Sequence, residues 1–372
     1  MFHIQDPYFS NSYTLHEALI ESCSNSIIGY GAFAFASKSG IEILLKDDNF
    51  SQLLDRGHYS IIVGIDEITN TASIEALSAI KRNKPNLLIK AFCHSNKGSL
   101  FHPKVSFFKH ENGEGSLIVG SGNLTIGGLR RNREAFSLVA LSKLEFIKVE
   151  TYWKSWLQES EKFLKDIDED EVIRRVNENN YEKFKKINKL EVKEVEKEDS
   201  ISIDNNQTIE ESWLFNSDSK ILLAEIPKSG DRWKQANFDI DNFQNFFGAT
   251  PGDNSQRILL RHLNQDCTLA PIEIRPSVSV KSKNYRFELD AASDWDYPEE
   301  GRPIGVFIQL TTRMFLYHLY MPSQENYTEI KQFMDSKWTG RIDRMIRVNS
   351  NAHEMNHLFN QSFFNQYFAQ KE

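Results

Sequence analysis

Three continuous apolar runs separated by amphipathic segments constrain the fold of this chain more than any other feature. The runs are residues 26–35 (SIIGYGAFAF), 60–66 (SIIVGID) and 86–93 (NLLIKAFC). Each has the length and unbroken apolar character of a strand that is buried on both faces. Helical patterns lie around and between them, at residues 14–23, 40–57 and 71–82. This alternation predicts an α/β layer with a largely parallel sheet.

The next stretch of the chain extends the same layer. Strand-like segments with short connections follow at residues 102–109 (HPKVSFFK), 115–123 (GSLIVGSGN) and 134–141 (EAFSLVAL). Residues 143–164 have the pattern of a long amphipathic helix that would close the domain. We therefore expect a first domain over residues 1–165.

The rest of the 372 residues divides into a connector and a second domain. Residues 166–211 are highly charged with few aromatic residues, which predicts a solvated helical or partly flexible connector. Residues 212–372 contain short β-rich runs with turn signals between them, which favours a barrel or sandwich, and residues 341–370 look helical. The β-rich runs are residues 221–228, 238–247, 257–263, 270–280, 284–291, 303–310 and 313–322.

Charge and cysteine content exclude few classes of protein. Most of the net charge of −8 lies between residues 161 and 211, so the total neither supports nor excludes a basic groove for nucleic acid. The cysteines Cys23, Cys93 and Cys267 are scattered, with neither a disulfide framework nor a zinc spacing. The N-terminus has no secretory pattern and no apolar run has the length of a membrane span. A cytoplasmic protein without a membrane partner is expected.

Polar groups mark the ends of the three strand-like segments between residues 100 and 141. Alternation places His102 and Lys104 on one strand face, where an imidazole can attack phosphorus and an ammonium can hold its oxygens. The turn Gly120-Ser121-Gly122-Asn123 allows close backbone approach, and Asn123 can donate to a phosphate oxygen. Glu134 could accept a hydrogen bond from an imidazole and fix its orientation.

This segment resembles the phospholipase D superfamily signature, His-x-Lys followed by Gly-Ser-x-Asn. It is most similar to the nuclease branch of metal-independent restriction endonucleases of the BfiI type (also termed NgoFVII-like), in which the trailing glutamate also belongs to the active site. The resemblance implies an α/β domain with a mixed sheet flanked by helices. It also implies catalytic roles for His102, Lys104, Asn123 and Glu134, with Ser121 in the matching turn. Lys109 stands where the broader superfamily often has an aspartate, which argues against a lipase.

The resemblance also bears on stoichiometry and cofactors. The superfamily mechanism uses two histidines, one as nucleophile and one as general acid, whereas this chain has one signature. We therefore expect a homodimer through the nuclease domain, with one composite site across a two-fold axis and a phosphohistidine intermediate. Imidazole replaces metal-activated water, so neither a metal nor another cofactor is expected.

Two polar stretches of the second domain suggest contacts with DNA. Residues 222–240 are rich in the side-chain types that bind base edges and phosphates, and residues 280–289 supply more of them. An ordinary solvated hairpin, with Trp233 filling the barrel end, is the alternative. The region from about 213 to 340 resembles the B3-like DNA-binding domain of these restriction enzymes, which implies a pseudobarrel. The candidate residues are Lys228, Ser229, Arg232, Trp233, Lys234, Gln235, Asn237, Lys281, Lys283, Asn284 and Arg286.

A competing motif lies near the C-terminus. His353-Glu354-Met355-Asn356-His357 is a literal H-E-x-x-H that would place two imidazoles on one helix face, as in zinc metalloproteases. Few residues follow it, and none before Glu372 offers a third ligand carboxylate.

The sequence thus predicts a sequence-specific, metal-independent DNA endonuclease, a restriction enzyme of anti-phage defence. Its expected partners are double-stranded DNA, a second copy of the chain, and possible ATPase/helicase and methyltransferase subunits. A phospholipase or other non-nucleic phosphodiesterase and a zinc metalloprotease remain alternatives.

Overall fold

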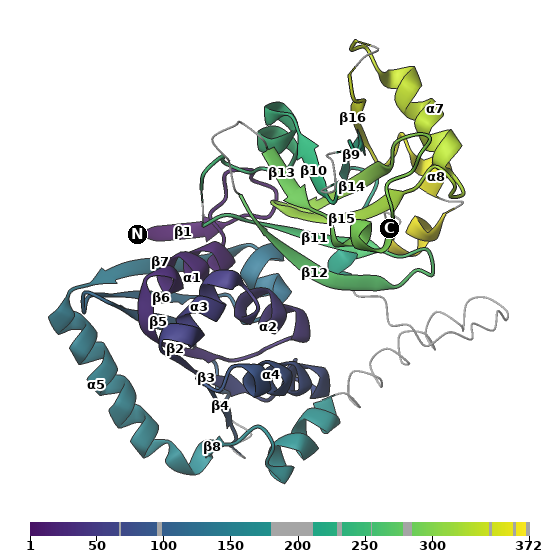
Figure 1. The fold of residues 1–372 in the computed structure, drawn as a ribbon. Coiled ribbons are helices and arrows are strands. Elements are labelled where there is room, and N and C mark those ends of the chain that lie inside the picture. Colours follow the sequence, from purple (N-terminus) through teal and green to yellow (C-terminus); the bar gives the residue numbers. More distant parts are fainter. Residues whose placement is uncertain are drawn as a thin grey trace. The chain divides into compact units, whose positions relative to one another are not determined.

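The strand and helix alternation predicted for residues 26–93 is present in a computed structural model of the chain (Figure 1). The structure describes residues 1–66, 68–94, 99–179, 211–228, 233–253, 255–277, 285–341, 344–359 and 362–369. The chain divides into unit 1, which comprises Met1–Asp6 and Tyr13–Gln207, and unit 2, which comprises Pro7–Ser12 and Thr208–Glu372.

Unit 1 contains an eight-stranded mixed sheet in the order β1-β7-β6-β5-β2-β3-β4-β8. Only β2, β3 and β4 are parallel to one another, and the remaining neighbours are antiparallel. The largely parallel sheet expected from the apolar runs is therefore wrong. β5 and β6 are joined by the short connection 111–114, which suits an antiparallel pair, and β7 adds antiparallel to β6. The strands are β1 (Phe2–Gln5), β2 (Ser26–Phe33), β3 (His58–Gly64), β4 (Leu87–Phe92), β5 (Lys104–His110), β6 (Gly115–Gly120), β7 (Glu134–Leu141) and β8 (Leu164–Lys165).

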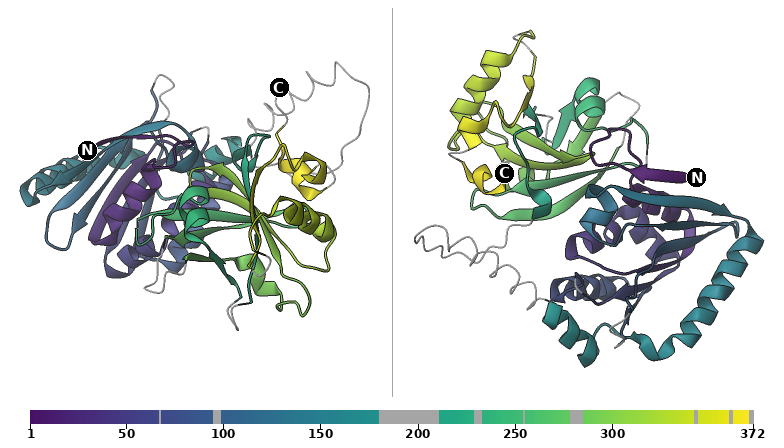
Figure 2. Two further views of the ribbon diagram at one scale, coloured as in Figure 1. Left: turned by 90° about the horizontal axis from the view of Figure 1, so that it is seen from above. Right: turned by 180° about the vertical axis from the view of Figure 1, so that it is seen from behind.

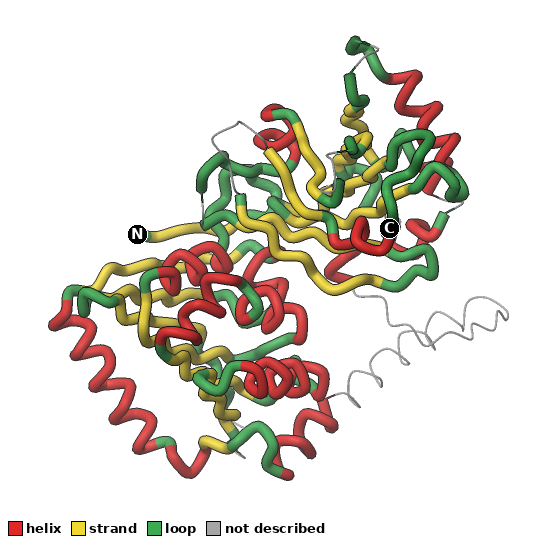
Figure 3. The backbone as a smooth tube through the Cα atoms, in the orientation of Figure 1, coloured by secondary structure: helices red, strands yellow, loops and turns green. Residues whose placement is uncertain are grey.

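Helices cover the two faces of this sheet unequally. Helices α1 to α4 lie on one face and α5 lies on the other, as Figures 2 and 3 also show. Helices α1 and α5 each begin with a capping box, formed by Thr14 with Glu17 and by Ser142 with Glu145. The helices are α1 (Leu15–Ser24), α2 (Lys38–Leu45), α3 (Asp48–Arg56), α4 (Thr71–Asn83) and α5 (Lys143–Glu159).

The predicted connector begins with ordered structure. Residues 170–179 are helical, and Ile167, Val172 and Val176 are buried. Asn179 donates to the backbone oxygens of Ile65 and Thr69 at 2.8 and 2.7 Å, which fixes this helix to unit 1. The start of the stretch is therefore part of unit 1, and residues 180–210 lie outside the described part of the chain.

Unit 2 is built mainly from strands. A six-stranded sheet has the order β12-β11-β15-β14-β9-β16, in which only β11 and β15 are parallel, and β10 pairs with β13 in a separate antiparallel sheet. The strands are β9 (Lys220–Glu225), β10 (Gln235–Phe238), β11 (Arg257–Leu263), β12 (Leu269–Pro276), β13 (Tyr285–Glu288), β14 (Ile304–Thr311), β15 (Met314–Tyr320) and β16 (Arg347–Asn351).

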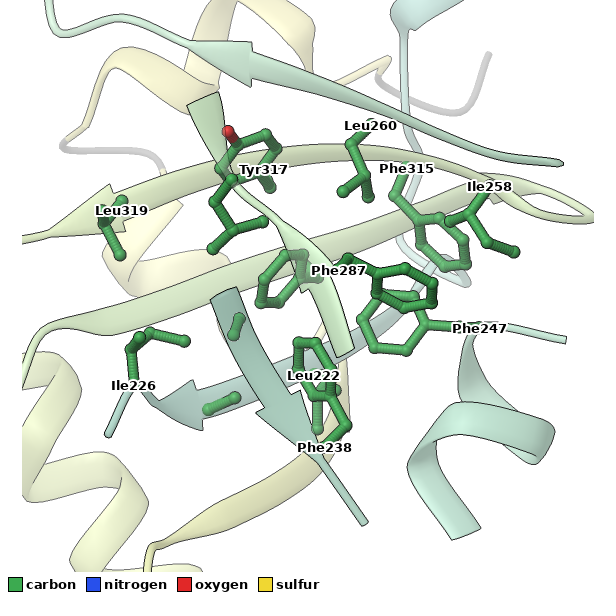
Figure 4. Packing of buried hydrophobic residues seen from close by; sticks show 14 of the residues in the cluster. Leu222, Ile226, Phe238, Phe247, Ile258, Leu260, Phe287, Phe315, Tyr317 and Leu319 are labelled. Atoms are coloured by element: carbon green, nitrogen blue, oxygen red, sulfur yellow. The ribbon is translucent and has the colours of Figure 1, made fainter. Parts of the chain in front are cut away.

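One aromatic core joins the two sheets of unit 2 (Figure 4). Phe238 from β10 and Phe287 from β13 pack with Phe307 and Phe315 of the larger sheet, around Phe247. These rings meet edge-to-face or tilted at centroid distances of 4.7–5.8 Å. Such packing contributes beyond the buried area alone and makes the two sheets one folded body.

The C-terminal segment differs from the helical prediction. Residues 347–351 form β16, which pairs with β9 from Arg347↔Ala224 to Asn351↔Lys220. Among the described residues beyond it, α8 (Asn356–Phe359) and a short 3₁₀ turn, η7 (Phe363–Tyr367), are the helical elements. The strand forms because it satisfies the backbone groups along the open edge of β9, a tertiary gain that outweighs local propensity.

Two further elements of unit 2 differ from the sequence interpretation. Residues 238–247 are expected as a β-rich run. In the structure Phe238 ends β10, and the turn η5 (Asn242–Phe246) follows. Helix α7 (Tyr327–Lys337) was not predicted, although Ile330 and Met334, four residues apart, are its buried positions.

Candidate active site

The polar groups predicted between residues 100 and 141 lie at one end of the unit 1 sheet. β5 begins at Lys104, which is opposite Phe33 at the carboxyl end of β2. β6 ends at Gly120, which is opposite Phe136 near the start of β7. The start of β5, the end of β6 and the start of β7 therefore meet at the edge where the parallel strands β2 and β3 end, the common location of ligand sites in α/β sheets.

His102 and Lys104 form the centre of this site. Lys104 Nζ lies 3.0 Å from each ring nitrogen of His102 and 3.3 Å from its backbone oxygen. His102 is exposed just before β5, and its ring meets the Phe35 ring edge-on at 5.8 Å. Partial burial lowers the pKa of Lys104, while the nearby Glu134 carboxylate opposes that shift. A neutral imidazole beside an ammonium is suited to attack and hold a phosphoryl group.

The Gly-Ser-Gly-Asn turn is held by close backbone packing. A Cβ on Gly122 would lie 2.5 Å from Leu15 Cδ2 and 2.7 Å from the Gly128 oxygen, so no larger residue fits there. Asn123 accepts a hydrogen bond at Oδ1 from the Phe35 amide at 3.2 Å. Since the side-chain oxygen is used in this way, the Asn123 amide nitrogen is the group that can donate to a ligand.

Glu134 is bound by neighbours that sequence reasoning did not assign to it. Its carboxylate accepts from Ser121 Oγ and, at 3.1 Å, from Asn132 Nδ2. Gln5 is paired opposite Glu134 and is fully buried, and it donates to the Asn132 oxygen at 2.9 Å. Within this one chain the carboxylate thus contacts Ser121 and Asn132 rather than His102, and its orienting role toward an imidazole stays a prediction. The position of Asn132, two residues before Glu134, was the available signal.

A buried ion pair supports the segment between the turn and Glu134. Arg130 lies in η1 (Gly127–Arg131), a π-helical turn, and donates to Glu17 at 3.2 Å and to Thr14 Oγ1 at 3.0 Å. The side chains of Arg130 and Glu17 are 0% and 1% exposed. The pair thereby joins the start of α1 to the backbone that carries the site.

An apolar pocket of about 660 Å³ opens beside His102 on the α5 side of the sheet. Its walls come from β4, β5, β6, α5 and the segment before His102. Phe92, Phe101 and Trp156 contribute rings to it, and His102 and Pro103 lie at its border. The sequence interpretation missed this pocket, because its walls are assembled from residues far apart in the chain.

The DNA-binding candidates of unit 2 have mixed environments. Trp233 is buried in the aromatic core and meets Tyr297 at 5.5 Å, so it fills the core instead of reaching DNA, as in the alternative considered for this residue. Lys228 and Lys234 are exposed and Arg286 is partly exposed. Gln235 donates to Glu288 at 3.0 Å on the facing strand. Ser229, Arg232, Lys281, Lys283 and Asn284 lie outside the described residues.

Asn237 also serves the fold of unit 2. It lies on β10 opposite Arg286, and its backbone oxygen accepts from Arg347 Nη2 at 2.8 Å. Its side chain is only partly exposed, so this position contributes little surface to a partner.

The H-E-x-x-H motif does not have the helical geometry that a zinc protease requires. β16 ends at Asn351 and residues 352–355 form a turn, so of the two histidines His357 lies in α8 and His353 does not. Glu354 accepts instead from Lys337 at 3.1 Å and Ser350 at 3.0 Å. Over the part of the chain that the structure describes, no three His, Cys, Asp or Glu side chains gather in a possible metal site. The described helices also include none that is long and apolar enough to cross a membrane.

Comparison with known proteins found similarity to solved structures of nucleases and phosphodiesterases. No sequence family and no curated protein matches the chain. NucT from Helicobacter pylori is 15% identical, with a TM-score of 0.31 over 44% of this chain and 98% of that protein. Nuc from Salmonella typhimurium, a phospholipase D family member, is 18% identical, with a TM-score of 0.33 over 45% and 97%. Yeast tyrosyl-DNA phosphodiesterase is 15% identical, with a TM-score of 0.26 over 38% and 32%.

Proposed function

We propose that this chain is a phosphodiesterase of the phospholipase D type that cleaves DNA without a metal ion. The observation that carries the proposal is the convergence of four side chains at one sheet edge. His102 and Lys104 are in contact there, and the Gly-Ser-Gly-Asn turn and Glu134 lie on the adjoining strand ends. These groups supply a nucleophile, a cation and amide donors for a phosphoryl group.

The chemistry would proceed in two displacements at phosphorus. The neutral His102 imidazole attacks the phosphodiester, the bond to the leaving sugar oxygen breaks, and that oxygen takes a proton from a second imidazolium. The second imidazole then removes a proton from water, and the hydroxide displaces His102 from the phosphohistidine. Lys104 and the Asn123 amide nitrogen stabilise the negative charge of the equatorial oxygens in both steps.

The second imidazole would come from another copy of the chain. We propose a homodimer that brings two His102 side chains to one composite site across a two-fold axis. Exposed apolar side chains on the α5 side of unit 1 support such an interface. Leu144 and Ile147 of α5 are exposed, as are Val119 of β6 and Val139 of β7 on the same face of the sheet.

Unit 2 would provide sequence specificity. We propose that it is a B3-like DNA-binding domain, and that Lys228, Lys234 and Arg286 contact DNA at its surface together with the candidates outside the described residues. This arrangement fits a restriction endonuclease in cytoplasmic anti-phage defence, with a cognate methyltransferase and a possible ATPase/helicase subunit as partners.

A non-nucleic phosphodiesterase, such as a phospholipase, is the second candidate function. The observation that favours it is the apolar pocket beside His102, which has the volume to hold part of an acyl chain. The same catalytic groups would serve either substrate, so the choice depends on what this pocket binds.

Cleavage of plasmid and phage DNA in EDTA tests the proposal. Wild-type protein should produce defined ends, and His102→Ala should abolish cleavage while DNA binding remains. His353→Ala is the matched control, because this exposed histidine of unit 2 is remote in sequence from the signature and belongs to the H-E-x-x-H motif. Cleavage retained in His102→Ala, or a strict need for Mg²⁺, would overturn the proposal. Choline release from phosphatidylcholine vesicles, lost in the same variant, would favour the second candidate.

A further inference from the structure

Three aromatic rings with nearly parallel planes line the pocket beside His102. The rings of Phe92 and Phe101 stack on each other at 4.2 Å with planes 11° apart, so they form a set of parallel rings rather than one plane. Trp156 lies 6.2 Å from Phe92 and 6.4 Å from Phe101, and its plane differs from theirs by only 8° and 16°. Three nearly parallel rings contributed by β4, the segment before His102 and α5 therefore favour a planar ligand over a round or branched one.

The described lining of the pocket has little polar character. None of its described lining residues is Lys, Arg, Asp or Glu, and its few polar groups include His94, Ser99 and Tyr152. A phosphate would find no lysine or arginine among these described lining residues, whereas Lys104 stands with His102 at the neighbouring sheet edge. Charge thus divides the site into a part for the phosphate and a part for a neutral group attached to it.

From these two features we propose that the pocket binds an unpaired nucleobase next to the scissile phosphate. The inference rests on the proposed function and specifies its substrate: the nucleotide whose phosphate meets His102 places its base on the Trp156 side of the site. In a continuous duplex that base is paired and stacked, so the pocket selects single-stranded or locally opened DNA. Stacking is tolerant of base identity, so the pocket adds affinity without fixing the recognition sequence.

Other occupants agree less well with these features. An acyl chain gains nothing from the parallel orientation of the rings, and aliphatic side chains would serve it equally. A side chain from a second copy could fill the space, but the exposed apolar residues Leu144 and Ile147 of α5 do not line the pocket. Both occupants give distinct outcomes in the experiment that follows.

The test is binding of a charge-matched pair of probes to the uncleaving His102→Ala protein. One probe is a fluorescein-labelled twelve-residue thymidylate strand, and the other is an abasic strand with the same phosphates. Fluorescence anisotropy should show the thymidylate strand binding more tightly than the abasic strand. In the His102→Ala background, Trp156→Ala should reduce this preference roughly 5- to 150-fold, the range that corresponds to stacking of one base.

Two variants control for other effects of the substitution. Trp156→Phe keeps an aromatic ring and should retain the preference, which separates stacking from a loss of folding. Ile173→Ala removes an exposed apolar side chain of unit 1 that lies outside both the pocket and the proposed dimer face, and it should also retain the preference. An equal preference in Trp156→Ala and in its parent overturns the proposal. Two other results would also overturn it. In the first, Trp156→Ala loses binding to phosphatidylcholine vesicles but keeps its base preference. In the second, both Trp156→Ala and Leu144→Ala cause the dimer to dissociate.

The proposed function fails separately from this inference. If wild-type protein does not cleave DNA in EDTA but the base preference depends on Trp156, the cleavage proposal falls and the pocket assignment stands. If His102-dependent cleavage is observed but the preference is insensitive to Trp156, only the pocket assignment falls.

Discussion

The ion pair between Arg130 and Glu17 should be among the most sensitive points of unit 1. Both side chains are buried, 113 residues separate them, and Arg130 also donates to Thr14 Oγ1. Arg130→Met keeps most of the apolar volume but leaves the Glu17 carboxylate buried without the guanidinium. Breaking one partner of a buried pair costs about 3–5 kcal/mol, because the remaining charge loses its compensation. We expect a loss of this size in the free energy of unfolding of unit 1.

The measurement must follow each unit separately, since the chain has two. Hydrogen exchange by mass spectrometry at increasing urea concentration gives a midpoint for peptides of each unit. Peptides of α1 and β7 should shift together in Arg130→Met, and those of β14 and β15 should not. Adding Glu17→Gln to the variant should restore much of the loss, because the uncompensated charge is then gone.

Arg174→Met is the matched control for this experiment. Arg174 forms an i,i+4 pair with Glu178 at 2.7 Å, and both side chains are more than half exposed. Solvent screens such a pair, so its removal should change the midpoint little. If Arg130→Met shifts the midpoint no more than Arg174→Met does, the argument from burial is refuted.

Two further predictions concern the site and the pH dependence of unit 2. Asn132→Ala removes the 3.1 Å bond to Glu134 and should lower kcat about tenfold with little change in KM, as expected for one hydrogen bond to a charged group. Asn112→Ala, which removes a similar bond to Glu114 on an exposed turn, should leave kcat unchanged, and equal effects would refute the assignment. Burial beside His262 lowers the pKa of His318 from 6.5 to about 3. As the pH falls, the unfolded state binds a proton at this histidine before the folded state does. The free energy of unfolding of unit 2 should therefore fall by about 2 kcal/mol between pH 7 and pH 5, measured by the same exchange method. His318→Asn should flatten this dependence, and an unchanged slope would contradict it.

The sequence by itself determined which edge of the unit 1 sheet carries the candidate site. Apolar runs and turn residues fix where β5, β6 and β7 begin and end, so the order of His102, Lys104, Asn123 and Glu134 at strand ends could be deduced from local pattern. The short connection at residues 111–114 favours an antiparallel pair of β5 and β6, which brings the start of β5 and the end of β6 to the same edge. The same local signals identified α1, α4 and α5, because caps and apolar periodicity lie within a few residues of one another.

Only the tertiary structure decided the contacts made over long sequence separations. The binding of Glu134 by Ser121, the pairing of Arg130 with Glu17 and the aromatic wall beside His102 depend on which elements become neighbours. Residues 347–351 became a strand because β9 offered an open edge, and Trp233 became core because two sheets closed over it. Local propensity is worth tenths of a kcal/mol per residue, whereas satisfied backbone groups and buried rings are worth several times more, so packing prevails where the two disagree.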